Sequence, residues 1–202
     1  EKIIALFPKT FYENTFGTVG VVNEETEIDS LKVVEVTPYR LESSYSDNRH
    51  PDTVTFSQKI EDDLQRRDFT INSLAYNASK SEIIDLYGGE KDIKDKVVRT
   101  VGKADLRFTE DALRILRAIR FSAELSFEIE AETEKSILEN AHLLKNISVE
   151  RIRDEFTKMI ESPEPMKALL ALKKLGLLEF ISPELEKTVG IEQGGTHSYD
   201  VW

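Results

Sequence analysis

The hydrophobic pattern of the chain changes near residue 100, and this change restricts the fold more than any other feature. Before that point, short runs rich in β-branched residues are bounded by turn residues, which is typical of strands. These runs lie at residues 16–22, 31–40, 51–56 and 81–89. After it, apolar residues recur at helical spacing, at residues 109–125, 131–144, 148–162 and 164–180. The sequence therefore predicts an α+β fold, in which a small mixed sheet is followed by an all-helical part.

Single residues mark two of the expected helix boundaries. Thr109 precedes two acidic residues, as at a helix N-terminus, and Gly176 is placed to end the last helix. The change of pattern also predicts a boundary between the two parts at residue 103.

The composition excludes several classes of protein. The 202 residues include no cysteine, so disulfide bonds and thiolate metal sites are absent. The sequence contains no run of about 18 apolar residues, so it predicts no membrane span and no membrane partner. The first residues also lack a signal-peptide pattern. These features predict a cytoplasmic protein. The net charge of −11 disfavours a nucleic acid partner, but residues 103–120 contain five basic and three acidic residues and predict a local basic patch.

Three adjacent charges, Arg66, Arg67 and Asp68, lie directly before the short apolar run at residues 69–74. A solvated charge cluster is one interpretation. The other is a site at the base of a rigid element that binds a charged, polyhydroxylated ligand.

The segment Glu110–Phe121 predicts a second candidate site. On a helical wheel its apolar residues fall on one side, and Asp111 and Arg114 project together on the other. They could form a solvated ion pair or read a nucleobase. A carboxylate accepts from the amino group of cytosine or adenine, and a guanidinium donates to the neighbouring ring acceptor. Uracil and guanine place a carbonyl where the amino group would be, so such a pair would select C and A.

Four stretches together, in this order and spacing, resemble the class II (bacterial-type) tRNA nucleotidyltransferases and their poly(A) polymerase relatives. They lie at residues 66–77, 85–102, 110–130 and 148–160. The resemblance implies an enzyme that adds C and A to the 3′ end of tRNA from CTP and ATP without a nucleic acid template. Poly(A) polymerases, C-adding enzymes and A-adding enzymes share these motifs. A nucleotide- or RNA-binding module without chemistry remains an alternative.

The resemblance also assigns roles to residues. The nucleotide's ribose and phosphates would be contacted by Arg66, Arg67, Asp68 and Asn72. Its base would be read by Asp111 and Arg114, within the motif that begins at Glu110, with Arg117 as support. A hinge between head and neck would lie at Asp85, Gly88, Gly89 and Asp92, although a simple turn is the alternative. Glu150 and Arg151 would support the neck. The expected domains are a head at 1–103, a neck at 104–162 and the start of a helical body or HD-type domain at 163–202.

Nucleotidyl transfer implies divalent metal ions, here Mg²⁺, held by carboxylates. In the family these carboxylates come from an Asp-x-Asp motif that follows a Gly-Gly-x-Val-Arg-Asp loop. Neither motif occurs in the first 60 residues. Glu35 matches a third carboxylate and is the one catalytic and metal-ligating candidate; an ordinary edge-strand glutamate is the alternative. We therefore expect a chain that is inactive alone. It would be a fragment, a split gene with an N-terminal companion segment, or a degenerate homologue. Its end, at His197 and Asp200, resembles the start of an HD-type domain.

Overall fold

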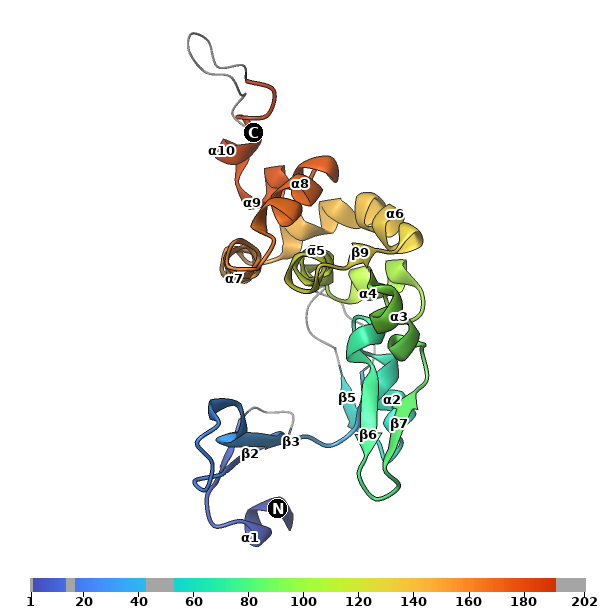
Figure 1. Ribbon diagram of the computed structural model, residues 1–202, viewed down its shortest axis with the longest axis vertical. Coiled ribbons are helices and arrows are strands. Elements are labelled where there is room, and N and C mark those ends of the chain that lie inside the picture. Colours follow the sequence, from blue (N-terminus) through green and yellow to red (C-terminus); the bar gives the residue numbers. More distant parts are fainter. Residues whose placement is uncertain (1, 14–16, 43–52, 192–202) are drawn as a thin grey trace. The chain divides into compact units, whose positions relative to one another are not determined.

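The computed structural model describes residues 2–13, 17–42 and 53–191, which pack as two compact units (Figure 1). The first unit lies within Glu1–Ser43 and Thr53–Arg66, and the described part of the second begins at Arg67. The boundary expected at residue 103 from the change of hydrophobic pattern therefore falls inside the second unit. Residues 67–103 pack with the helices that follow them, and sequence pattern carries no signal for such packing.

The first unit contains a three-stranded antiparallel sheet in the order β1-β2-β3. Its strands are β1 (Thr10–Tyr12), β2 (Val19–Val22) and β3 (Val33–Val36), with α1 (Lys2–Leu6) before them and η1 (Asp29–Leu31) between β2 and β3. Gly20 lies in register with Phe11 on one side and Glu35 on the other. A Cβ at Gly20 would lie 2.5 Å from the Phe11 ring. The glycine therefore lets that ring pack close to the sheet in the same row as Glu35.

The expected strand at residues 31–40 is interrupted at Pro38 and becomes two strands. Proline has no N–H to donate to a ladder, and the chain leaves β3 before it. A second antiparallel ladder then joins β4 (Arg40–Glu42) to β5 (Val54–Phe56). The helix α2 (Ile60–Gln65) follows, and it was not predicted from the sequence.

The second unit begins with a short 3-10 turn and a hairpin. The turn is η2 (Thr70–Asn72), and the hairpin pairs β6 (Leu74–Asn77) with β7 (Glu82–Asp85). After the hairpin come α3 (Gly89–Asp95) and β8 (Val97–Val98). β8 pairs in parallel with β9 (Glu128–Ile129), so a two-residue strand lies within the part expected to be all helical.

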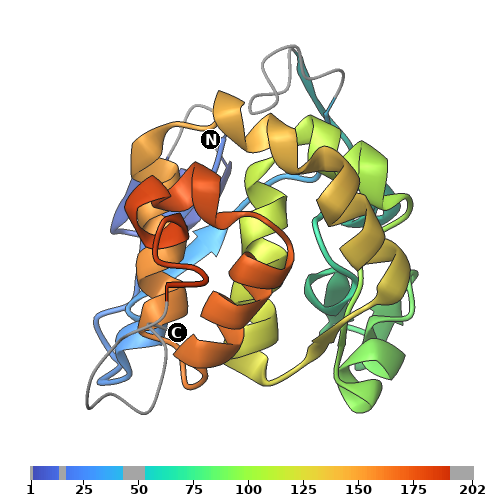
Figure 2. The ribbon, with the colours of Figure 1, turned by 90° about the horizontal axis from the view of Figure 1, so that it is seen from above.

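Helices make up most of the rest of the second unit. They are α4 (Ala104–Glu110), α5 (Leu113–Leu125), α6 (Ala131–Asn140), η3 (Ala141–Asn146), α7 (Val149–Ile160), α8 (Pro165–Lys174), α9 (Leu178–Ile181) and α10 (Pro183–Glu186). The apolar face of α5 is the centre of the core, where Ile115, Leu116 and Ile119 are fully buried. α7 and α8 pack against α5 (Figure 2). The α+β class is confirmed, with separate small sheets in place of one mixed sheet.

The helix expected at residues 109–125 corresponds to α5 and to the last two residues of α4, and α4 itself was not predicted from the sequence. α4 continues through Thr109 to Glu110, so Thr109 is not a cap. The chain turns at Asp111, whose φ of −142° and ψ of 104° are extended, and Asp111 Oδ1 accepts from the backbone N–H of Leu113 at 3.1 Å. The expected end at Gly176 is confirmed by its φ of +64°. In the described residues, no helix has the length and apolar character needed to cross a membrane.

Candidate functional site

The junction of α4 and α5 brings together the residues expected to read a base. Arg114 donates from Nη1 to Glu110 Oε2 at 2.6 Å and to the backbone oxygen of Arg107 at 3.3 Å. Glu110 also pairs with the Arg107 guanidinium. The Arg114 side chain is only 11% exposed. Its guanidinium is thus oriented by a neighbouring carboxylate before any ligand arrives.

Asp111 is held by a residue from a distant helix. Arg151, on α7, donates from Nη1 to Asp111 Oδ1 at 3.2 Å and from Nη2 to Oδ2 at 2.8 Å. The Asp111 side chain is 19% exposed. The alternative of a solvated ion pair between Asp111 and Arg114 does not fit, because both side chains are largely buried and each is bound to another partner.

Asp68 joins the charged triplet to α5. Its Oδ2 accepts from Arg117 Nε at 2.8 Å and lies 2.6 Å from Nη2. Its Oδ1 accepts from the backbone N–H of Phe69 at 2.8 Å and from Asn72 Nδ2 at 3.3 Å. The Arg117 guanidinium also lies 5.2 Å from the centre of the Phe121 ring. The structure therefore brings together Asp68, Asn72 and Arg117, one helical turn along from Arg114.

The two arginines of the triplet have different surroundings. Arg66 belongs to the first unit, where its Nη2 lies 2.6 Å from Asp63 and its Nη1 lies 3.3 Å from Glu42. Arg67 belongs to the second unit and donates from Nη1 to the backbone oxygen of Asn72 at 3.0 Å. The triplet is therefore not one solvated cluster. Contact of these arginines with phosphates remains a prediction.

The basic patch expected at residues 103–120 is largely neutralised. Arg107 and Arg114 share Glu110, and Arg117 pairs with Asp68. Arg120 is buried, and its Nε lies 3.1 Å from the buried Glu155 of α7. Only the three-dimensional fold supplies the last two carboxylates, so the sequence could not reveal this neutralisation.

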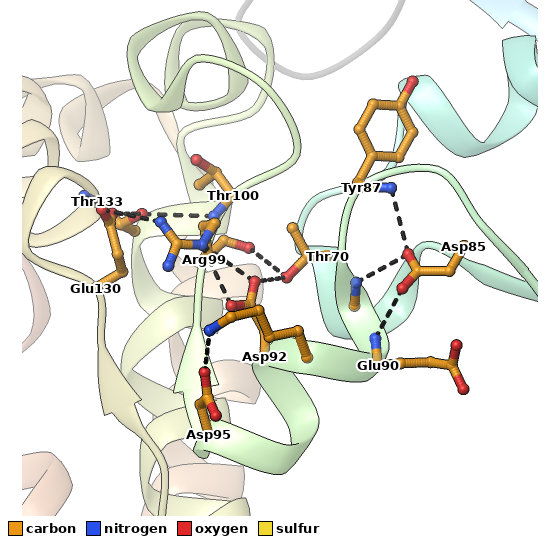
Figure 3. A network of polar contacts seen from close by, with 12 residues as sticks. Thr70, Asp85, Tyr87, Glu90, Asp92, Asp95, Arg99, Thr100, Glu130 and Thr133 are labelled. Atoms are coloured by element: carbon orange, nitrogen blue, oxygen red, sulfur yellow. Dashed lines mark hydrogen bonds and ion pairs between the residues drawn. The ribbon is translucent and has the colours of Figure 1, made fainter.

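The predicted hinge contains a carboxylate that caps a helix (Figure 3). Asp85 accepts from the backbone N–H groups of Gly89 at 2.9 Å, Glu90 at 3.0 Å and Tyr87 at 3.3 Å. Burial raises the pKa of a carboxyl group, but these donors outweigh it and hold the pKa of Asp85 below its ordinary value of 3.8. Gly88 takes a φ of +78°, which favours glycine.

Asp92, which is buried, extends this region into a partly buried polar network (Figure 3). It accepts from Thr70 Oγ1 at 2.7 Å and from Arg99 Nε at 3.1 Å. Arg99 Nη1 lies 3.1 Å from Glu130, which in turn accepts from the backbone N–H of Thr133 at 2.7 Å. The network ties α3 to η2 and to the start of α6. Thr70, Arg99 and Glu130 were not singled out from the sequence, because only long-range contacts reveal them.

Glu35 lies on β3 with an exposed side chain. Among the residues that the structure describes, no group of three or more His, Cys, Asp or Glu could hold a metal ion. Glu150 lies in the first turn of α7 and is exposed. The roles of Glu35 as a metal ligand and of Glu150 in supporting a neck remain predictions.

Comparison with known proteins identifies the family. Residues 1–99 match the family model described as the poly(A) polymerase head domain, and residues 126–188 match the probable RNA- and SrmB-binding site of polymerase A. The chain is 43% identical over 188 residues to a CCA-adding enzyme of Geobacillus thermodenitrificans. The alignment covers 93% of this chain and 45% of that protein. The chain belongs to the family of CCA-adding enzymes and poly(A) polymerases.

Other members of this CCA-adding enzyme and poly(A) polymerase family confirm the fold. A CCA-adding enzyme of Lactobacillus johnsonii is 51% identical over 163 residues, which are 81% of this chain and 39% of that protein. The crystal structure of the Bacillus stearothermophilus enzyme in complex with CTP superposes with a TM-score of 0.79 at 39% identity. It covers 93% of this chain and 44% of that one. The chain spans less than half the length of these relatives.

The Asp85 cap predicts how stability depends on pH. Because the pKa of Asp85 is lowered by folding, its ionised form stabilises the fold above pH 3.8, and this contribution is lost as the pH falls below that value. Asp85→Asn is expected to be about 1 kcal/mol less stable at pH 7 and to lose this part of the acid dependence. Urea unfolding from pH 7 to pH 3 measures both. Glu90→Gln keeps the backbone donor and is the matched control; an equal loss of acid dependence in the control would contradict the assignment to Asp85.

Proposed function

We propose that this protein acts in template-independent addition of C and A to the 3′ end of tRNA, using CTP and ATP. The observation that carries the proposal is the α4–α5 junction. There, the carboxylate of Asp111 and the guanidinium of Arg114 are each held by a separate partner, in a chain 43% identical to a CCA-adding enzyme. A tRNA substrate would place the protein in the cytoplasm.

The junction supports selection of C and A. Asp111 is an acceptor only, and three of its roughly four acceptor positions are filled by Arg151 and by the Leu113 N–H. Among the described residues this leaves one position, on Oδ2, which would accept the amino group of cytosine or adenine. Arg114 would donate to the neighbouring ring nitrogen. Uracil and guanine would place a carbonyl against the carboxylate and be repelled.

The rest of the nucleotide would be held by the other motif residues. Arg67 suits the triphosphate, because guanidinium groups bind phosphate oxygens with two parallel donors. A phosphate contact by Arg66, which belongs to the first unit, stays a separate prediction. Asn72 and Asp68 would contact the ribose, with Arg117 held in place by Asp68. Residues 126–188 match a model described as a probable RNA-binding site and would contact the tRNA. CCA-adding enzymes have been seen with tRNA and with ATP, in structures with TM-scores of 0.69 and 0.71.

Nucleotidyl transfer in this family generally uses a divalent metal, and we propose Mg²⁺. The described residues do not complete a site for it. Glu35 would supply one oxygen, whereas Mg²⁺ prefers near-octahedral oxygen coordination, and no cluster of three ligands exists in the described residues. The other ligands would have to come from outside these residues.

A poly(A) polymerase is the second candidate, because the head of the chain matches a domain of that name. A-adding or C-adding enzymes use the same motifs. A binding module without chemistry is a third candidate, favoured by the incomplete metal site.

The test is incorporation of labelled CTP and ATP into tRNA that lacks its 3′ CCA, in Mg²⁺ buffer. The chain is assayed alone and with an added segment carrying Gly-Gly-x-Val-Arg-Asp and Asp-x-Asp. We expect no product from the chain alone and C, C and A in order after complementation. A run of A would identify a poly(A) polymerase. No product in either arm, with CTP binding intact, would indicate a binding module.

A further inference from the structure

We propose that Arg151 determines base specificity by fixing the orientation of Asp111. This inference rests on the proposed function, because it concerns the same base-reading residues. Arg151 lies 40 positions from Asp111 in the sequence and reaches it from α7. It is a positioning residue, since it acts on the base through Asp111 and not by contact.

The contact is a two-point clamp. Two guanidinium nitrogens face the two oxygens of the Asp111 carboxylate, at 3.2 Å and 2.8 Å. Paired donors of this kind fix the plane of a carboxylate as well as its position. The Leu113 N–H, at 3.1 Å from Oδ1, adds a third contact. Among the residues that the structure describes, one acceptor position on Oδ2 is left, and its direction is set by the clamp.

Arg151 itself rises from an anchored helix. Glu155 lies one turn further along α7, on the same face, and its Oε2 is 3.1 Å from Nε of Arg120 on α5. Both of those side chains are at least 90% buried. Ile152 and Met159 bury the apolar face of α7 in the core. These contacts hold α7 against α5, so the backbone that carries Arg151 has a fixed position relative to α5.

Loss of the clamp is expected to change base specificity. The side chains of Arg151 and Asp111 are 24% and 19% exposed, so the pair lies at the edge of the core. Without Arg151, Asp111 keeps the Leu113 N–H and can rotate about its side-chain bonds. A rotating carboxylate has no fixed acceptor to offer an amino group, so cytosine loses its advantage over uracil.

The experiment compares CTP and UTP binding by isothermal titration calorimetry for the chain, Arg151→Gln, Arg151→Lys and Arg153→Gln. Arg153 is the matched control, because it lies on the same helix and pairs with Asp154 at 68% exposure. We expect Arg151→Gln to lower the CTP-to-UTP affinity ratio about tenfold, the size of a lost base contact. Arg151→Lys keeps the charge but not the paired guanidinium donors, so most of the preference for CTP over UTP should be lost. Arg153→Gln should keep the CTP-to-UTP affinity ratio of the unmodified chain.

The outcomes separate this inference from the proposed function. An unchanged ratio in both Arg151 variants, with the chain itself preferring CTP, would overturn the role of Arg151 and leave the proposed function intact. No preference in the chain itself would overturn base reading altogether, and the role of Arg151 with it. Thermal melts of all four proteins identify any variant that fails to fold, and Arg151→Lys then decides, because it preserves charge and most of the volume.

Discussion

Gly89→Ala is expected to destabilise the second unit by about 3 kcal/mol, the upper range for forcing a methyl group into a packed site. An added Cβ would lie 2.3 Å from the backbone oxygen of Thr70 and 3.0 Å from its carbonyl carbon. A backbone carbonyl cannot move aside as a flexible side chain would. The clash would also displace η2, which begins at Thr70 shortly after Asp68. Equilibrium unfolding in urea, followed by circular dichroism, measures the loss.

Gly102→Ala is the matched control for this prediction. Gly102 has a φ of +68° but nothing within 4 Å of an added Cβ. It should therefore show only the conformational cost of that backbone region, about 1 kcal/mol. Equal losses in the two variants would mean that α3 does not lie against Thr70 as described.

Arg114→Ala is expected to weaken CTP and ATP binding about 30-fold, within the range for loss of a base contact together with its oriented charge. UTP binding should change much less, because uracil offers no acceptor at that ring position. The fold should persist, since Glu110 keeps its pairing with Arg107. Calorimetric titration of the three nucleotides measures the effect.

Arg107→Ala is the control for that variant. It removes the other guanidinium paired with Glu110 and leaves the contact of Arg114 with that carboxylate. Nucleotide affinity should fall no more than about threefold, as for loss of a modest supporting interaction. If Arg107→Ala weakened binding as much as Arg114→Ala, the effect would come from Glu110 and the junction as a whole, and not from a base contact by Arg114.

Local signals made the helices and part of the candidate site predictable. Apolar residues at helical spacing identified the segments that became α5, α7 and α8, and Gly176 marked an end correctly. The break at Asp111 and the helix before it escaped prediction, because Thr109 and the two acidic residues after it suggested that the helix starts there. The hydrogen bond from the Leu113 N–H to the Asp111 carboxylate cannot be inferred from a helical wheel.

Contacts between residues far apart in the sequence limited how much of the candidate site could be predicted. The types and spacing of Asp111 and Arg114 predicted a reader of bases, but their holding partners could not be inferred. Arg151 lies 40 positions from Asp111, and Arg117 lies 49 positions from Asp68. Such pairs depend on how α5 packs on α7 and on η2. The division of the chain near Arg66 escaped prediction for the same reason.

Hydrogen exchange of the α4–α5 junction tests the central claim most directly. The chain is exchanged in Mg²⁺ buffer with no nucleotide, with CTP, with ATP and with UTP, and protection is followed across residues 104–125. Base reading by Asp111 and Arg114 predicts protection of this segment by CTP and ATP and little by UTP. Equal protection by UTP, or protection by none of the three, would contradict it.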